Sequence, residues 1–359
     1  MRAISRAVML LVAGLAVAQV ARAQWTVQHS GLDTNLRGVS VVANGSPDGS
    51  VTVWASGSNG VILRSIDAGK HWKRLPAVGG KDADGRLLDF RGIAALSEKI
   101  AYVMSSGEGE KSTIYKTMDG GESWVLQYTD KRKEFFLDGL VCLSEQECYV
   151  LGDPIDGKFV LLATKDGEHW ESLSSRNMPA ALAGEGAFAA SNSSLSANKD
   201  REIFFGTGGL EARVYRSMNG GKTWNVVKSP IASGNASSGI FSITRGSGKT
   251  VFVVGGDYKN QEAATGIAAY SPDEGATWHL AEASPTGYRS AVVWLDEGGL
   301  VAVGPTGSDI SRDSGLHWKT LGSMPLNAMS TLKPDEVWAV GPNGTIAHFG
   351  IRRFLSGIR

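Results

Sequence analysis

Seven positions in the chain carry a polar side chain directly before Gly, Ser or Ala, near the start of a short segment. These positions are Arg37, Arg91, Asp138, Glu185, Ser238, Arg289 and Asn327. The planar guanidinium group of arginine matches a carboxylate, so three converging arginines would bind a polar or carboxylate-bearing ligand. Asp138 and Glu185 could act as the acid and base of a glycosidase if they lay about 5–9.5 Å apart. The alternative is a solvated lining whose charges pair with one another.

Glycine-rich turns supply a second set of polar side chains. This set contains Asp153, Asp156, Arg213, Asp257 and Tyr258. We expect these residues on the rim of the same site. Because polar residues are also common in turns for backbone reasons alone, ordinary turn chemistry is the alternative for each of them.

A repeated turn motif indicates which elements position these side chains. Six segments share the pattern Ser/Thr-x-Asp-x-Gly-x-x-Trp, although the third is one residue shorter and the fourth has Asn in place of Asp. The acidic or amide positions are Asp67, Asp119, Asp166, Asn219, Asp273 and Asp313, spaced 40 to 54 residues apart. This period matches the size of a four-stranded propeller blade.

The motif, an Asp box, is suited to a folded turn rather than to catalysis. Its Asp or Asn can accept hydrogen bonds from backbone N–H groups one turn later, and its glycine can adopt a positive φ. The tryptophan begins the next strand and buries a large apolar ring. We therefore expect these residues to be structural.

The spacing of the boxes predicts an all-β fold, a seven-bladed β-propeller with four-stranded antiparallel blades. Six blades carry a box, and three further strands follow Trp318 without one. The segment that starts at Trp25 resembles a fourth strand, so we expect this N-terminal strand to complete the last blade and close the ring. The first strand of each blade lines the channel of a propeller, which would place the seven polar positions at one channel mouth.

The Asp boxes and the segment GDPIDGKFVLLATKDGEHW resemble exported bacterial relatives of the photosystem II stability/assembly factor family. This family belongs to the Asp-box, or bacterial neuraminidase repeat, superfamily. The resemblance covers about the whole mature chain. It implies a non-enzymatic scaffold that docks on membrane-protein partners through an arginine-bearing surface, with Arg37, Arg91 and Arg289 as the matching residues. The partner itself does not carry over.

The competing hypothesis is a glycoside hydrolase or carbohydrate-binding protein of the sialidase-like branch, with a glycan as ligand. The F/Y-R-I-P motif of sialidases is absent, since Arg37 lies in LRGV and Arg91 in FRGI. No Ser-His-Asp arrangement and no phosphate-binding glycine loop is visible, so we expect no cofactor. The sequence favours a binding protein over an enzyme.

The N-terminus has the features of a secretory signal peptide. Two arginines precede an apolar run, and Ala21-Arg22-Ala23 resembles a cleavage site. We therefore expect a signal peptide at residues 1–23 and a single propeller domain at residues 24–359. The mature protein would be periplasmic or extracellular, would not insert into a membrane, and would be a monomer.

The net charge limits the classes of partner, and the two cysteines indicate a possible covalent link. The 36 basic and 36 acidic residues give a net charge of zero, which argues against nucleic acid as a partner. Cys142 and Cys148 flank a polar turn, and export would permit a disulfide between them. The alternatives are that the two cysteines are free thiols or that they belong to a metal site. No metal-ligand spacing in the sequence supports a metal site.

Overall fold

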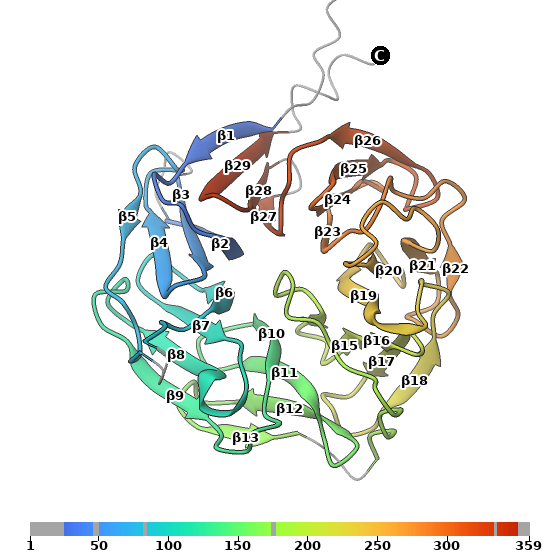
Figure 1. The fold of residues 1–359 in the computed structure, drawn as a ribbon, viewed down its shortest axis with the longest axis horizontal. Helices are drawn as coiled ribbons and strands as arrows, with labels where there is room; N and C mark the ends of the chain where they lie inside the picture. Colours follow the sequence, from blue (N-terminus) through green and yellow to red (C-terminus); the bar gives the residue numbers. More distant parts are fainter. Residues whose placement is uncertain (1–24, 46–49, 82–84, 174–176, 334–335, 351–359) are drawn as a thin grey trace, which may run out of the picture.

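The computed structural model describes residues 25–45, 50–81, 85–173, 177–333 and 336–350. Within these ranges, seven antiparallel sheets surround a central axis (Figure 1). The expected signal peptide, residues 1–23, lies outside the described residues. No helix in the described ranges is long and apolar enough to span a membrane.

The first three blades each contain four strands in chain order. They are β2 (Leu36–Ala43), β3 (Val51–Gly57), β4 (Val61–Ser65) and β5 (Lys73–Arg74) in the first; β6 (Phe90–Ala95), β7 (Ala101–Ser105), β8 (Thr113–Thr117) and β9 (Val125–Thr129) in the second; and β10 (Leu137–Cys142), β11 (Cys148–Ile155), β12 (Lys158–Thr164) and β13 (Trp170–Ser172) in the third. A single 3₁₀ turn, η1 (Gly109–Lys111), precedes β8 in the described chain.

The next three blades follow the same plan. They are β14 (Leu195–Ala197), β15 (Ile203–Gly206), β17 (Arg213–Ser217) and β18 (Asn225–Lys228) in the fourth; β19 (Asn235–Arg245), β20 (Val251–Asp257), β21 (Ala268–Ser271) and β22 (His279–Leu280) in the fifth; and β23 (Ala291–Trp294), β24 (Leu300–Gly304), β25 (Gly307–Ser311) and β26 (Trp318–Gly322) in the sixth. The short strand β16 (Gly208–Gly209) pairs with β19 and so links the fourth blade to the fifth.

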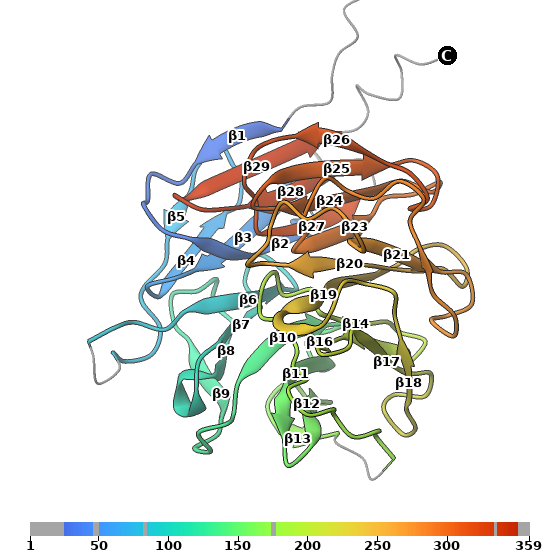
Figure 2. The same ribbon diagram turned by 45° about the vertical axis from the view of Figure 1, so that its right-hand side comes forward.

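The seventh blade joins the two ends of the described chain. It consists of β27 (Ala328–Lys333), β28 (Glu336–Val340), β29 (Thr345–Gly350) and β1 (Thr26–His29). The outermost strand β1 pairs antiparallel with β29, and the two strands lie side by side in both views (Figures 1 and 2). The predicted seven-bladed fold and its closure by an N-terminal strand are thus confirmed.

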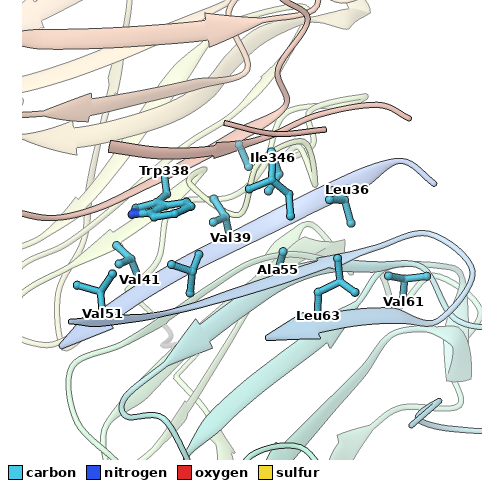
Figure 3. Packing of buried hydrophobic residues seen from close by; sticks show 12 residues of the cluster. Leu36, Val39, Val41, Val51, Ala55, Val61, Leu63, Trp338 and Ile346 are labelled. Atoms are coloured by element: carbon cyan, nitrogen blue, oxygen red, sulfur yellow. The ribbon is translucent and has the colours of Figure 1, made fainter. Parts of the chain in front are cut away.

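Apolar side chains fill the space between neighbouring blades. Between the seventh and first blades, Trp338 and Ile346 pack against Val39, Val41 and other residues of β2 and β3 (Figure 3). Both Trp338 and Ile346 are essentially inaccessible to solvent. Because each sheet is covered on both faces by its neighbours, the strands are apolar on consecutive residues, as expected for sheets buried on both sides.

The Asp boxes fold into turns held by side-chain hydrogen bonds, as the sixth blade shows. Ser311 Oγ donates to Asp313 Oδ1 at 2.9 Å and accepts from the N–H of Gly315 at 3.0 Å. Asp313 Oδ1 also accepts from the N–H of His317 at 3.0 Å. The buried Trp318 ring donates its Nε1 hydrogen to the carbonyl of Gly315 at 3.1 Å. In this arrangement the carboxylate organises the backbone of the turn.

The structure joins Cys142 and Cys148 by a disulfide. The two cysteines face each other across the hairpin of β10 and β11, where they are direct cross-strand partners. The bond therefore closes the end of the hairpin.

We predict that Trp25→Ala will destabilise the ring at its closure. The Trp25 side chain is 5% exposed, lies 5.4 Å from the Phe349 ring, and donates to Ser308 Oγ at 3.0 Å. Removing a buried indole should lower the free energy of unfolding by about 3–5 kcal/mol, measured by urea denaturation. The control is Val27→Ala on the adjoining strand β1, where the side chain is 39% exposed. Equal losses from the two variants would contradict the closure role.

Candidate ligand-binding cavity at the channel mouth

A cavity of about 500 Å³ lies on the axis of the ring. Four of the seven predicted channel residues line it, namely Arg37, Arg91, Asp138 and Asn327. Two of the predicted rim residues, Asp153 and Tyr258, line it as well. Ser290 and Pro305 of the sixth blade also line it, so the first, second, third, fifth, sixth and seventh blades all contribute to the cavity.

A shared backbone irregularity positions three of these side chains. The strand register shifts at Arg37, at Arg91 and at Asp138, so each is the extra residue of a β-bulge. A bulge redirects the side chain of the extra residue. The glycine that follows each bulge leaves room for a close neighbour: a Cβ on Gly92 would lie 2.5 Å from Asn192 Oδ1. The polar-Gly pair in the sequence thus marks a bulge at the channel.

The two cavity arginines converge on a single oxygen atom. Arg37 donates to the carbonyl of Ala189 at 3.2 Å, and Arg91 donates to the same carbonyl at 3.4 Å. Arg91 is also held by Asp89 at 2.8 Å. Burial and the neighbouring charge of Arg91 lower the pKa of Arg37. The arrangement presents two guanidinium groups to one acceptor.

Arg289 was expected in this ring, and the structure corrects that expectation. Its side chain is fully buried in the sixth blade, where it forms an ion pair with Asp309 at 2.5 Å. It also donates to Thr286 Oγ1 and Thr306 Oγ1, at 2.7 and 2.8 Å. Because a buried guanidinium requires a countercharge and acceptors, Arg289 turns toward this pocket of partners rather than the channel. The site holds two of the three predicted arginines.

Glu185 also lies outside the inner strands and outside the cavity lining. The inner strand of the fourth blade, β14, begins only at Leu195. Glu185 forms an ion pair with Arg213, whose Nε donates to Oε1 at 2.9 Å, and accepts from Thr207 Oγ1 at 2.5 Å. It borders an adjoining space of about 400 Å³, whose lining shares Asp153, Ala187 and Phe188 with the cavity. The predicted acid–base pair of Asp138 and Glu185 therefore does not face one common cavity.

The other predicted site residues occupy ordinary structural positions. Ser238 is buried and bonds to the carbonyl of Asn235 at 3.1 Å. Asp156 is exposed, with a φ of +52°, in the turn between β11 and β12. Asp257 accepts from Asn235 Nδ2 and from the N–H of Lys259. Arg213 is the partner of Glu185. The side chains of Ser238, Asp257 and Arg213 are thus held by local hydrogen bonds or an ion pair.

A segment that sequence reasoning missed fills the centre of the ring. Residues 184–194, here called the plug, belong to the connection from β13 to β14, which reaches toward the axis in Figure 1. Asn192 Oδ1 accepts from the N–H of Leu140 at 2.7 Å, and Ser191 Oγ donates to the carbonyl of Ser290 at 2.6 Å. Ser193 Oγ lies 2.7 Å from Ser242 Oγ. The plug thereby contacts the third, fifth and sixth blades.

The plug also supplies an aromatic wall to the cavity. Phe188 stacks on Phe241 with ring centroids 3.8 Å apart. Phe241 in turn makes edge contacts with Tyr258 and Tyr288. All four rings line the cavity. The sequence signal that could have revealed the plug is its run of small residues, AFAASNSS, which resembles no strand of the other blades.

The pKa values of the two carboxyl groups that line the cavity are raised. Burial, together with the charge of Asp153, raises the pKa of Asp138 well above its usual value, and Arg91 opposes the shift. Burial likewise raises the pKa of Asp153, although a hydrogen bond from the N–H of Ala187 opposes it. The cavity therefore combines two cationic groups, aromatic surface and a carboxyl group that favours its neutral form. Among the described residues, no cluster of His, Cys, Asp and Glu could hold a metal ion.

Fold and site together define an Asp-box propeller with a recessed polar cavity at its centre. The family described as "Photosynthesis system II assembly factor YCF48" matches residues 93–349. The chain belongs to this family.

Two solved structures share the fold over nearly the whole chain. The structure described as "YCF48 bound to D1 peptide" has a TM-score of 0.64 at 14% identity and covers 91% of this chain and 96% of that one. YCF48 from Cyanidioschyzon merolae has a TM-score of 0.60 at 13% identity, with 91% and 98% covered. No curated protein sequence matches the chain.

We predict that Asp138→Asn will stabilise the protein in a pH-dependent way. A raised pKa in the folded state means that Asp138 stabilises the fold at low pH and that this contribution is lost as pH rises through the folded-state pKa. The variant should match the wild type near about pH 4 and exceed its free energy of unfolding by about 1–3 kcal/mol at about pH 7. The measurement is urea denaturation across pH. A pH-independent difference, or one shared by the exposed Asp156→Asn control, would contradict the burial argument.

We predict that Asn192→Ala will loosen the plug. The variant leaves the N–H of Leu140 without its acceptor and places alanine at a φ of +65°. Amide hydrogen exchange should rise in residues 187–194, by a factor of about ten, while the outer strands remain protected. Asn59→Ala is the matched control, since Asn59 is exposed and has a φ of +58°. Unchanged exchange in the plug would show that these bonds do not hold it.

Proposed function

We propose that the chain is an exported, non-enzymatic binding or assembly protein that holds a protein partner at its channel mouth. Family membership supports an assembly role for a propeller of this kind. The interaction is attributed to Arg37 and Arg91, which bind a carboxylate of the partner. Export to the periplasm is inferred from the signal-like segment at residues 1–23.

The observation that carries this proposal is the convergence of Arg37 and Arg91 on the carbonyl of Ala189. Two guanidinium groups that share one neutral acceptor have unused capacity for an anion. A carboxylate at this position would gain two charge-assisted hydrogen bonds, which are about twice as strong as neutral ones. The side chain of Arg37 also has a buried Nε for which no partner is found in the described chain.

The nature of the partner is inferred from the comparison. One of the similar solved structures holds a D1 peptide. A peptide segment is therefore a reasonable occupant for the present cavity, whose aromatic wall and arginines suit a chain with apolar and acidic side chains.

A pull-down from periplasmic and membrane extract tests the proposal. The bait is the mature protein, compared with the double variant Arg37→Ala/Arg91→Ala after circular dichroism has verified folding. We expect the double variant to recover a partner at least about tenfold less efficiently, because truncating buried charged contacts costs about 2–5 kcal/mol.

The matched control is Lys70→Ala/Arg74→Ala, which removes the same charge from exposed positions of the first blade. This control should retain the partner. Equal recovery by all three proteins would contradict the proposed surface. If glycans rather than proteins are retained, the carbohydrate-binding alternative replaces the assembly role.

A further inference from the structure

Asp138 has no hydrogen-bond partner for one of its carboxyl oxygens. The residue is 1% exposed, and no group in the described chain bonds to its buried Oδ2. It nevertheless lines the cavity that also contains Arg37 and Arg91. Because buried polar groups are almost always satisfied, an orphan oxygen at the wall of a cavity points to a partner supplied by a ligand.

We propose that Asp138 is a specificity-determining residue, whose carboxyl group donates a hydrogen bond to the carboxylate held by Arg37 and Arg91. The inference rests on the proposed function, since it concerns the same cavity. It defines the ligand as a carboxylate attached to an apolar or aromatic group. The carboxylate would lie between the two guanidinium groups and Asp138, and the apolar part would lie against the aromatic wall.

The position of Asp138 explains how a carboxyl group can bind an anion. It occupies the same bulge position on β10 as Arg37 on β2 and Arg91 on β6, so the three side chains are directed by equivalent backbone. A neutral carboxyl group carries an O–H donor, whereas an ionised one only accepts and would repel a ligand anion. Hydrogen bonds from O–H to a carboxylate are short and strong.

Burial favours the neutral form of Asp138. It raises the pKa of Asp138 well above the usual value, the charge of Asp153 on β11 adds to this shift, and the charge of Arg91 on β6 opposes it. The plug segment from Gly186 to Ser194 contributes no titratable side chain. Asp138 therefore keeps its proton at a pH at which exposed aspartates have lost theirs, and that proton is available to the ligand.

The apolar half of the proposed ligand follows from the aromatic wall. The stacked pair of Phe188 and Phe241 presents its rings to the same cavity as the arginines. Tyr258 is 41% exposed at the rim and could cover the ligand after entry. An aromatic ring on the ligand would gain both apolar burial and ring–ring contacts here.

Calorimetric titration of the mature protein with phenylacetate tests the proposal, with phenylacetamide as the uncharged control. Binding of phenylacetate should be saturable and should weaken at least about tenfold as pH rises and Asp138 ionises. Asp138→Asn, which keeps an N–H donor in place of the O–H, should bind within about threefold of the wild type at low pH and lose this pH dependence. Asp138→Ala should bind about tenfold more weakly at low pH.

The exposed Asp156→Asn serves as the matched control and should behave as the wild type does. The proposal is overturned if phenylacetate does not bind saturably, if affinity is constant or rises with pH, or if Asp138→Ala binds as well as the wild type. Binding that depends on Arg37 and Arg91 but not on Asp138 overturns this inference alone and leaves the proposed function standing. If the recovery of a partner in the pull-down did not depend on Arg37 and Arg91, the proposed function would be overturned instead.

Discussion

Hydrogen bonds between neighbouring inner strands hold the ring together at its axis. The N–H of Val41 in the first blade donates to Ser330 Oγ of the seventh, and the N–H of Ala95 in the second donates to Ser40 Oγ of the first. Seven inner strands that converge leave backbone donors facing the channel, and these donors must be satisfied if they are buried. Serine is short enough to bridge adjacent blades without filling the channel.

The plug provides hydrogen-bond partners for further buried backbone groups at the centre of the ring. Asn192 Oδ1 accepts from the N–H of Leu140, and the carbonyl of Ser193 accepts from the N–H of Ile243. The same segment places Ala189 against the two cavity arginines and Phe188 on the aromatic wall. The plug therefore both satisfies backbone groups at the axis and shapes the cavity.

The fold was predictable because its signals are local and periodic. The Asp boxes marked the blades, Trp25 marked the closing strand, and the polar-Gly pairs marked the inner-strand positions of Arg37 and Arg91. Interactions between residues far apart in the chain left no such signal in the sequence. Arg289 aligns with the cavity arginines, although Ser290 follows it where Gly follows Arg37 and Arg91. Asp309 on another strand of the same blade binds it. The aligned motif at Glu185 lies in the plug rather than in a strand, because the fourth blade begins later in the chain.

Site-specific photo-crosslinking tests the central claim most directly, namely that partners bind at the channel mouth. A photoreactive phenylalanine analogue would replace Tyr258 on the cavity rim, and in a separate protein it would replace Met118, which is 66% exposed on an Asp-box turn. Irradiation in periplasmic and membrane extract should yield a crosslinked partner from position 258, reduced by Arg37→Ala/Arg91→Ala, and none from position 118. A partner crosslinked from position 118 and not from position 258 would contradict the account.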